Sequence, residues 1–322
     1  MGLSAGPVRA QAGKSKVVEV HSQAVAGGAE VTAELAGQML LKGMTALTGE
    51  ADLGRAFGKF VGPDDVVGLK VNCRAAPGLV TNTVLAMAVA EGCKAAGVPE
   101  NNVIIWDRFQ RDLQVGGYPV NEGNAGIRCY GSEWGSAVGY DPEVFVECEP
   151  PGDGGSKRSP VSNIVTKHLT KIINLPLLKD HDIAGITFCL KNLAYGSINN
   201  TARSHPAPYR CDPLIAMVCA LPVLRQKTVL HIGDALRGQY EGGPDCKPEY
   251  MHSFGSLLIS ADPVACDVVG LDILEATRKA KGASPIIGSQ RPPKHLATAA
   301  AQGVGTDDRE RIERVKVEAS PP

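Results

Sequence analysis

The chain of 322 residues is poor in aromatic side chains, has almost no net charge and contains no long apolar run. Aromatic residues make up 5% of it, too few to predict the stacking platforms that bind single-stranded nucleic acid. The formal net charge is −1, so no basic field predicts a nucleic acid or an anionic membrane as partner. No apolar run approaches the ~20 residues of a membrane-spanning helix. We therefore expect a globular protein with no nucleic-acid partner and no membrane span.

Cysteine spacing excludes the simplest metal sites. Nine cysteines occur and no two of them form a CxxC pair, so spacing predicts neither a zinc ribbon nor a ferredoxin cluster. Several lie within apolar strand or helix patterns, which favours buried, reduced thiols. The alternative is a metal or iron–sulfur centre that draws on Cys73, Cys189 and His205.

Residues 1–15 are small and apolar at the start and include the A-x-A pattern Ala10-Gln11-Ala12. This pattern resembles the tail of an export signal, and the alternative is a disordered start. The first interpretation predicts an exported, periplasmic protein, which we favour over a cytoplasmic one.

Strand and helix patterns alternate along most of the chain. Strand patterns occur at 16–21, 66–71, 103–107, 171–178, 228–234, 257–260 and 312–317. Helix patterns occur at 31–47, 51–61, 82–96, 183–194, 213–225, 263–281 and 294–302. This rhythm predicts an α/β fold with a largely parallel sheet flanked by helices.

The same pattern suggests two lobes. We assign 16–150 to an N-terminal α/β lobe, with a Gly/Pro-rich insertion at about 108–150. Residues 161–322 form the second α/β lobe, and the loop 150–160 is the candidate boundary.

Residues 171–205 carry the strongest functional pattern. An apolar strand pattern ends directly before Lys179 and His181, and a helical stretch with Lys191 and Asn192 follows. Ligands of α/β sheets bind outside the carboxyl ends of the strands. We therefore predict an active site here, and the alternative for His181 is a histidine that bonds a loop carbonyl.

The residue types in this segment fit acid–base and anion-binding chemistry. His181 has the ordinary pKa range for proton transfer near neutrality, and Lys179 and Lys191 can hold a carboxylate or phosphate. His205 lies in a loop-like SHPAPY stretch, which favours ordinary surface exposure.

Three further polar residues stand at strand ends. Lys70 and Asn72 share one face of their strand and predict an anion or cofactor contact, with a structural ion pair as the alternative. Asp234 precedes a glycine-rich loop and could bind a metal or orient a basic group. His231 is more typical of a satisfied core residue. Asp267 lies among apolar residues and needs a partner, for which we suggest Lys70 or Lys191.

The chain resembles the domain of unknown function 362 family. The matching core positions are Pro176, Leu178, Lys179, His181, Ala184, Gly185, Thr187, Leu190, Lys191, Asn192 and Gly196. Further matching stretches are GLKVN at 68–72, GDALRGQYEGGP at 233–244, SADPVACDVVG at 260–270 and AQGVGTDD at 301–308. The resemblance implies a link to iron–sulfur proteins, because members are often fused to a ferredoxin domain. It also implies export, because members with twin-arginine signals occur.

A more distant resemblance is to the nickel-pincer lactate racemase family. It rests on the ten-residue spacing from His181 to Lys191, on Ala184-Gly185 and on the later His205. It implies that His181 carries protons, Lys191 anchors a cofactor and His205 binds a metal. FCLK stands where that family shows GGRK.

These observations predict an enzyme that acts on a small carboxylate- or phosphate-bearing ligand. His181 and Lys191 are the predicted catalytic residues, and Lys70, Asn72, Lys179, Asn192 and Asp234 the predicted ligand or cofactor contacts. The alternatives are an iron–sulfur or other metal-linked redox protein, and a non-catalytic exported binding or assembly protein. A homo-oligomer and a redox partner both stay open.

Overall fold

A computed structural model describes residues 13–319, and its centre is one eleven-stranded sheet. The strands of the chain are β1 (Ser15–His21), β2 (Val67–Lys70), β3 (Val103–Phe109), β4 (Arg128–Glu133), β5 (Tyr140–Glu147), β6 (Arg158–Ser162), β7 (Lys171–Asn174), β8 (Leu177–His181), β9 (Gly185–Thr187), β10 (Thr228–Gln239), β11 (Met251–His252), β12 (Ser256–Ser260) and β13 (Ile312–Glu318). The helices are α1 (Gln23–Ala26), α2 (Ala33–Thr48), α3 (Leu53–Phe57), α4 (Thr83–Ala95), α5 (Gln110–Val115), α6 (Cys189–Ser197), α7 (Leu214–Ala220), α8 (Pro222–Lys227), α9 (Pro263–Ala280) and α10 (Lys294–Ala301).

The strand order confirms an α/β fold with a mostly parallel sheet. The order is β13-β1-β12-β10-β7-β2-β3-β4, and β8, β9 and β11 attach beside β10. The pairs β2–β3, β2–β7, β3–β4, β7–β10, β8–β10 and β1–β13 are parallel. The strand β12 is antiparallel to both of its neighbours, β1 and β10. Consequently β1, β10, β7, β2, β3 and β4 all point the same way, and their carboxyl ends meet at one edge of the sheet.

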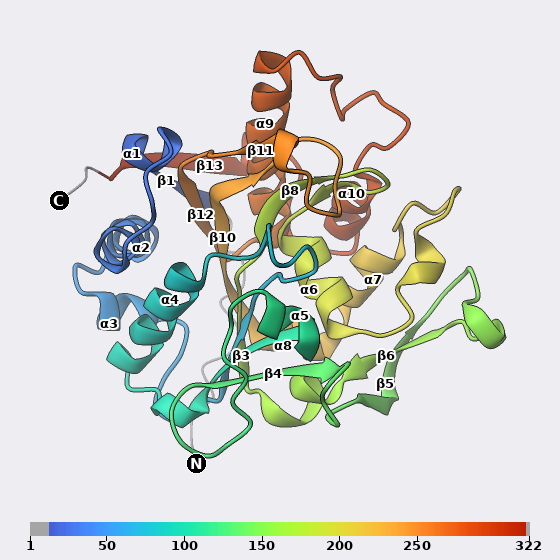
Figure 1. Cartoon of the computed structure of the whole chain (residues 1–322), viewed down its shortest axis with the longest axis horizontal. Helices are drawn as coiled ribbons and strands as arrows, with labels where there is room; N and C mark the ends of the chain where they lie inside the picture. Colours follow the sequence, from blue (N-terminus) through green and yellow to red (C-terminus); the bar gives the residue numbers. More distant parts are fainter. Residues whose placement is uncertain (1–12, 320–322) are drawn as a thin grey trace.

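Helices cover both faces of this sheet (Figure 1). The apolar strands are buried on both sides, as parallel strands between two helical layers must be. Ile172 and Ile104 pack into a core with α6, α7, α9 and α10, whereas the next residues, Ile173 and Ile105, pack into a second core with α2, α3 and α4. In the described part of the chain, no helix is long and apolar enough to cross a membrane.

The N-cap residues of two long helices, α4 and α9, are residues that commonly cap helices. The Asp262 side chain accepts hydrogen bonds from the backbone of Val264 and Ala265, and Pro263 stands in the first turn of α9. Asn82 caps α4 through the backbone N–H of Leu85. Both caps satisfy N–H groups that the helix itself leaves unpaired.

The region before α6 differs from the prediction. The predicted strand 171–178 is two strands, β7 and β8, which are separated at Leu175-Pro176 because proline has no N–H for the ladder. The predicted helix 183–194 is wrong in its first half, where β8 and β9 form a hairpin instead. Gly185 lies in that hairpin with φ +79°, a conformation that favours glycine.

Two further boundaries also differ. The predicted helix 213–225 is divided into α7 and α8, and α8 begins at Pro222. The predicted strand 228–234 continues to Gln239 as β10, which pairs first with β7 and then with β8.

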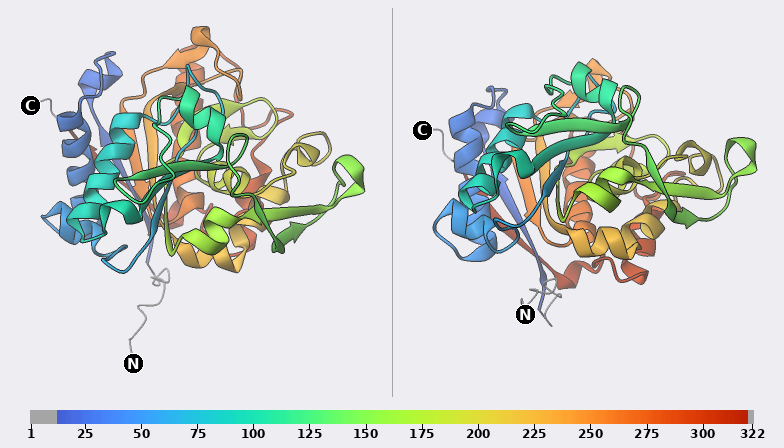
Figure 2. Two further views of the ribbon diagram at one scale, coloured as in Figure 1. Left: turned by 60° about the horizontal axis from the view of Figure 1, so that its bottom comes forward. Right: turned by 90° about the horizontal axis from the view of Figure 1, so that it is seen from below.

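The predicted insertion contributes to two different sheets. β4 joins the edge of the main sheet beside β3, whereas β5 pairs with β6 in a separate two-stranded sheet. Figure 2 shows this second pair extending away from the main sheet. Both predicted lobes contribute strands to the main sheet, and the division into lobes stays a prediction.

Candidate functional site

The carboxyl end of β8 places two basic side chains on the same face. Lys179 and His181 are two residues apart in the strand, so both point to one side, and each is 1% exposed. Lys179 Nζ donates a hydrogen bond to the Pro244 carbonyl, at 2.9 Å. Within residues 13–319, no carboxylate lies within 4.0 Å of this ammonium group.

Helix α6 supplies a third basic side chain to the same place. Lys191 is 8% exposed, and its Nζ lies 4.5 Å from the centre of the Tyr195 ring, one helical turn further on. The described residues offer it no carboxylate partner either. The positive charge of Lys191 lowers the pKa of both His181 and Lys179. In each case it is the largest cause after burial. We call Lys179, His181 and Lys191 the Lys–His cluster.

The hydrogen bonds of His181 determine where its proton lies. Its Nδ1 accepts the backbone N–H groups of Ile183 and Ala184, both at 3.1 Å. An Nδ1 that accepts has no proton, so the neutral ring carries its proton on Nε2. That Nε2 is buried and has no partner among the described residues. Because burial, the two lysines and His205 lower the pKa of His181 well below its ordinary value, the ring is neutral at pH 7.

His205 joins the cluster, contrary to the expected surface exposure. Its ring lies 5.7 Å from that of His181 and 5.3 Å from that of Tyr195, measured between ring centres. Its Nδ1 lies 3.1 Å from the Thr201 carbonyl, so Nδ1 carries the proton and Nε2 is free to accept. Burial and then Lys191 lower its pKa to about 4, and this ring is therefore also neutral at pH 7.

The two lysines of the cluster lose protons near neutral pH. Burial is the main cause and lowers the pKa of Lys179 to about 7, with Lys191 and Arg74 adding to the effect. Burial likewise lowers the pKa of Lys191 to about 8. Desolvation disfavours the charged form of an amine that has no counter-charge. An anion bound between these groups would supply that counter-charge.

Lys70 lies in different surroundings, in a closed polar network. Its Nζ forms an ion pair with Asp107 at 2.7 Å and also donates to Asn192 Oδ1 at 3.2 Å. Asn72 donates to the same oxygen, and Asn192 donates to Asn174. The structural ion pair that was the alternative interpretation of Lys70 is therefore present. The ligand-contact role of Lys70, Asn72 and Asn192 stays a prediction.

His231 is buried next to this network, as the sequence predicts. His231 is 1% exposed and its Nδ1 lies 3.1 Å from the Asn174 side-chain nitrogen. It is a satisfied core residue, as its place within a strand pattern predicts.

Asp267 does not pair with a lysine, so the suggested partners were wrong. Its two carboxylate oxygens accept the backbone N–H groups of Cys189 and Leu190, at 2.5 and 3.1 Å. These are the first residues of α6, which has no capping side chain at its own N-cap position. Asp267 thus stabilises the start of the helix that carries Lys191.

Two arginines next to His181, Arg278 and Arg291, were not predicted from the sequence. Asp180 is fully buried and forms ion pairs with Arg291 and Arg278. Arg291 also donates to the His181 carbonyl at 3.0 Å. Arg291 lies in the loop after α9, more than a hundred residues away in sequence, and no local pattern indicates this contact.

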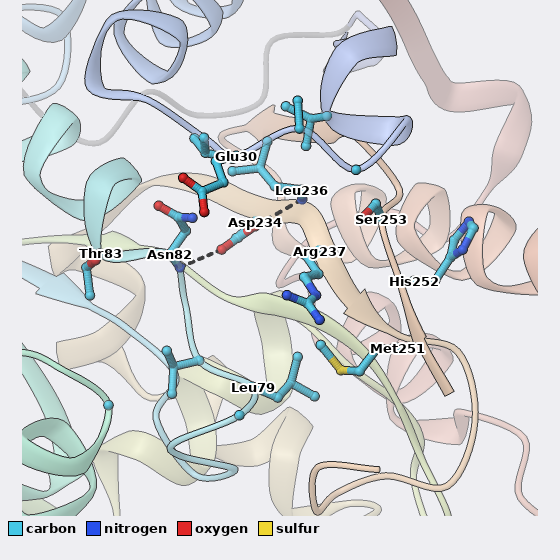
Figure 3. Close-up of a pocket in the computed structure, with 17 residues that line it drawn as sticks. Glu30, Leu79, Asn82, Thr83, Asp234, Leu236, Arg237, Met251, His252 and Ser253 are labelled. Carbon is cyan, nitrogen blue, oxygen red and sulfur yellow. Dashed lines mark hydrogen bonds between the residues drawn. The ribbon is translucent and has the colours of Figure 1, made fainter. Parts of the chain in front are cut away.

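Asp234 lies at a separate pocket at the same sheet edge (Figure 3). The pocket encloses about 660 Å³ and is lined by segments that follow β1 and β2 and by β10 itself. Asp234 accepts the backbone N–H groups of Asn82 and Leu236, at 2.7 and 3.0 Å. Burial raises its pKa to about 6. The described side chains that line this pocket do not include the Lys–His cluster.

The predicted metal ligands are not brought together. Cys73 packs in the core beneath α4, and Cys189 packs in the core on the opposite face of the sheet. Burial raises the pKa of both thiols well above the ordinary value, which disfavours the thiolate that binds metals. Within residues 13–319, no three His, Cys, Asp or Glu side chains converge as a metal site requires. Cys73, Cys189 and His205 therefore do not form a shared metal or iron–sulfur site in the described part of the chain.

Comparison with known proteins gives a family and one distant structure. A family model described as Domain of unknown function (DUF362) matches residues 67–272. No curated protein matches the chain. A solved structure, titled as the crystal structure of a protein from Thermotoga maritima, is similar at 10% identity with a TM-score of 0.40. That similarity covers 66% of this chain and 54% of the other, so this chain spans about half of its length.

Proposed function

The chain belongs to the DUF362 family, whose description assigns no activity, and we therefore propose its function from the site itself. We propose that the protein is an enzyme that binds a small carboxylate- or phosphate-bearing ligand at the Lys–His cluster. The segment that carries this cluster also carries the sequence resemblance that predicted membership of this family.

One observation carries the proposal. Lys179 and Lys191 are more than nine-tenths buried, and neither has a carboxylate partner among the described residues. Burying a charged amine without a counter-charge is costly, and buried charges in proteins are normally paired. Lys70, at the end of β2 in the same sheet, follows that rule through its ion pair with Asp107. A bound anion would pair the remaining two lysines, and the free Nε2–H of His181 would donate to it.

The cluster can also exchange protons with its ligand. A general acid or base works best when its pKa lies near the working pH, and the two lysines have pKa values of about 7 and 8. The neutral His181 ring cannot take a proton at Nδ1, which already accepts two backbone N–H groups. We therefore assign proton exchange to the lysines, and to His181 a hydrogen bond from Nε2 to a ligand oxygen.

The first experiment measures anion binding. Inorganic phosphate and lactate are titrated calorimetrically into the wild-type protein and into the Lys191→Met and Lys59→Met variants. Lys59 is an exposed lysine paired with Glu50 and serves as the control. We expect wild type and Lys59→Met to bind at least one of the two anions, and Lys191→Met to bind it at least tenfold more weakly. Equal binding by all three proteins, or none by the wild type, would contradict the proposal.

The second experiment tests proton exchange. A panel of small carboxylates is incubated with the protein in D₂O, and deuterium incorporation at carbon is followed by NMR. We expect incorporation with wild type and its loss in Lys179→Met. A protein that binds anions but exchanges no hydrogen in any of them would be a binding protein rather than an enzyme of this kind.

A further inference from the structure

The pocket beside Asp234 is a second candidate site, independent of the proposed function. Its lining comes from residues 25–31 after β1, residues 78–83 after β2, and β10 and β11. Since β1, β2 and β10 point the same way, this is the carboxyl edge of the sheet, where ligands of α/β proteins bind. Its volume of about 660 Å³ falls within the range of small-molecule sites.

Two carboxylates in the pocket lack a cation. Asp234 is 1% exposed, and its only partners among residues 13–319 are two backbone N–H groups, one on each oxygen. Each oxygen keeps a lone pair that can accept a further hydrogen bond. Glu30 lies beside Asn82 and Asp234 on the same wall, as Figure 3 shows. Neither carboxylate has an ion-pair partner in the described part of the chain.

The pocket also holds a cation without a carboxylate. Arg237 follows Asp234 along β10, and its guanidinium group lies between Asp234 and Met251 in Figure 3. No described carboxylate lies within 4.0 Å of it. An arginine fork matches a carboxylate in geometry and can bind it through two hydrogen bonds.

The remaining lining is apolar and fits a modest hydrocarbon group. Leu79, Leu236 and Met251 surround the polar groups, and Val31 and Val80 extend that lining. An apolar side chain of a ligand would gain free energy from leaving water here.

We propose that this pocket binds a small zwitterion with an apolar side chain, of the α-amino-acid type. The ligand ammonium would contact Asp234 and Glu30, and its carboxylate would contact Arg237. Such a molecule gives the buried Asp234 carboxylate and the exposed Arg237 guanidinium group each a partner of opposite charge, and the exposed Glu30 carboxylate shares the ammonium group. A ligand with a single charge leaves either the arginine or both carboxylates without a partner.

The test compares three probes that differ in one charge each. L-leucine, N-acetyl-L-leucine and L-leucinamide are titrated into the full chain by calorimetry. The acetyl derivative lacks the ammonium group, and the amide lacks the carboxylate. We expect leucine to bind and both derivatives to bind at least about tenfold more weakly, the effect of losing one charged contact. No binding of leucine, or equal binding of either derivative, would overturn the proposal.

Variants then assign the binding to this pocket. Arg237→Gln alters an exposed side chain, and we expect it to weaken leucine at least tenfold without altering the weak binding of leucinamide. Arg55→Gln, on the surface of α3, is the matched control and should bind leucine like the wild type. Glu30→Gln tests the contact with the ligand ammonium group. Asp234 itself is not substituted, because it accepts two backbone hydrogen bonds and its loss could impair folding. Unchanged leucine binding in both Arg237→Gln and Glu30→Gln would overturn the proposal.

Anion binding at the Lys–His cluster is measured separately. The Lys191→Met variant should keep its leucine affinity, because Lys191 does not line this pocket. Loss of leucine binding in Lys191→Met would place leucine at the cluster and overturn the second site.

Discussion

Two lysines at the ends of strands β2 and β8 of the same sheet show how one residue type takes two roles. Lys70 and Lys179 are each 1% exposed, yet only Lys70 has a carboxylate partner, Asp107. The pKa of Lys179 is lowered to about 7 because burial disfavours its charge. Lys70 therefore stabilises the fold, whereas the burial of Lys179 costs free energy of folding.

Substituting these two lysines should change stability in opposite directions. Lys70→Met leaves Asp107 buried and unpaired, and we expect a loss of about 3–5 kcal/mol in the free energy of unfolding. Lys179→Met removes an uncompensated charge, and we expect a gain on the order of 2 kcal/mol at pH 6.5. Urea denaturation of both variants and the wild type measures the difference.

The gain in Lys179→Met should depend on pH. The pKa of Lys179 is about 7 in the folded protein and 10.5 in its ordinary state, so the unfolded chain binds more protons between these values. The cost of the wild-type lysine is thus fully present below pH 7 and disappears as the pH rises toward 10.5. A variant that is destabilised at pH 6.5 would show that Lys179 has a counter-charge in the folded protein.

His181 offers a second test. In His181→Asn the amide oxygen can replace Nδ1 as acceptor for Ile183 and Ala184, but nothing replaces the Nε2–H donor. We expect a melting temperature near that of wild type and phosphate binding about tenfold weaker, the value of one hydrogen bond to a charged group. His181→Ala loses the acceptor as well and should melt at a lower temperature. Wild-type phosphate binding in His181→Asn would remove His181 from the site.

Helix α6 positions Lys191 through contacts with β2 of the sheet and with helix α9. Gly196 packs against Lys70, and a Cβ at this position would overlap Lys70 Cε and Nζ. The start of the helix depends on Asp267 in α9. The position of Lys191 is therefore set by contacts with two distant elements.

Gly196→Ala should destabilise the protein although alanine favours helices. The added methyl group displaces Lys70 and weakens its ion pair with Asp107, so we expect a loss of about 1–3 kcal/mol. Gly37→Ala, in α2, meets no atom within 4 Å and should instead stabilise by up to about 1 kcal/mol. Thermal or urea unfolding of the two variants compares them directly. Stabilisation by Gly196→Ala would mean that Lys70 is free to move.

Element types were predictable from sequence where the pattern was long and capped. The helix from Pro263 to Ala280 has a strong start signal at Asp262, and the structure confirms it. The sequence predicts a helix where β9 lies, because short apolar runs such as Ile183–Thr187 fit both periods. The ion pairs of Asp180 with Arg278 and Arg291 depend on a distant loop and have no local signal.

At the scale of the whole molecule, the sheet explains why distant residues meet. The alternation of strands and helices predicted a parallel sheet, and the parallel strands deliver Lys70, Lys179 and Asp234 to one edge. The strand order was not predictable, because β1 lies between β12 and β13, from the far end of the chain. That order also places the Asp234 pocket next to the segment after β1, which carries Glu30. His205 joined the cluster for the same reason, since only the folded chain brings its loop against His181.

Proton uptake on anion binding is the decisive measurement for the proposed role of Lys179 and Lys191. Phosphate is titrated at pH 8 in two buffers that differ in their heat of ionisation, and the difference in heat counts the protons taken up. With a pKa of about 7 Lys179 is largely neutral at this pH, and with a pKa of about 8 Lys191 is about half protonated, so both must gain protons to pair with an anion. We expect uptake of about one proton per bound phosphate, and a smaller uptake in Lys179→Met. Phosphate binding without proton uptake, or no binding at all, would contradict it.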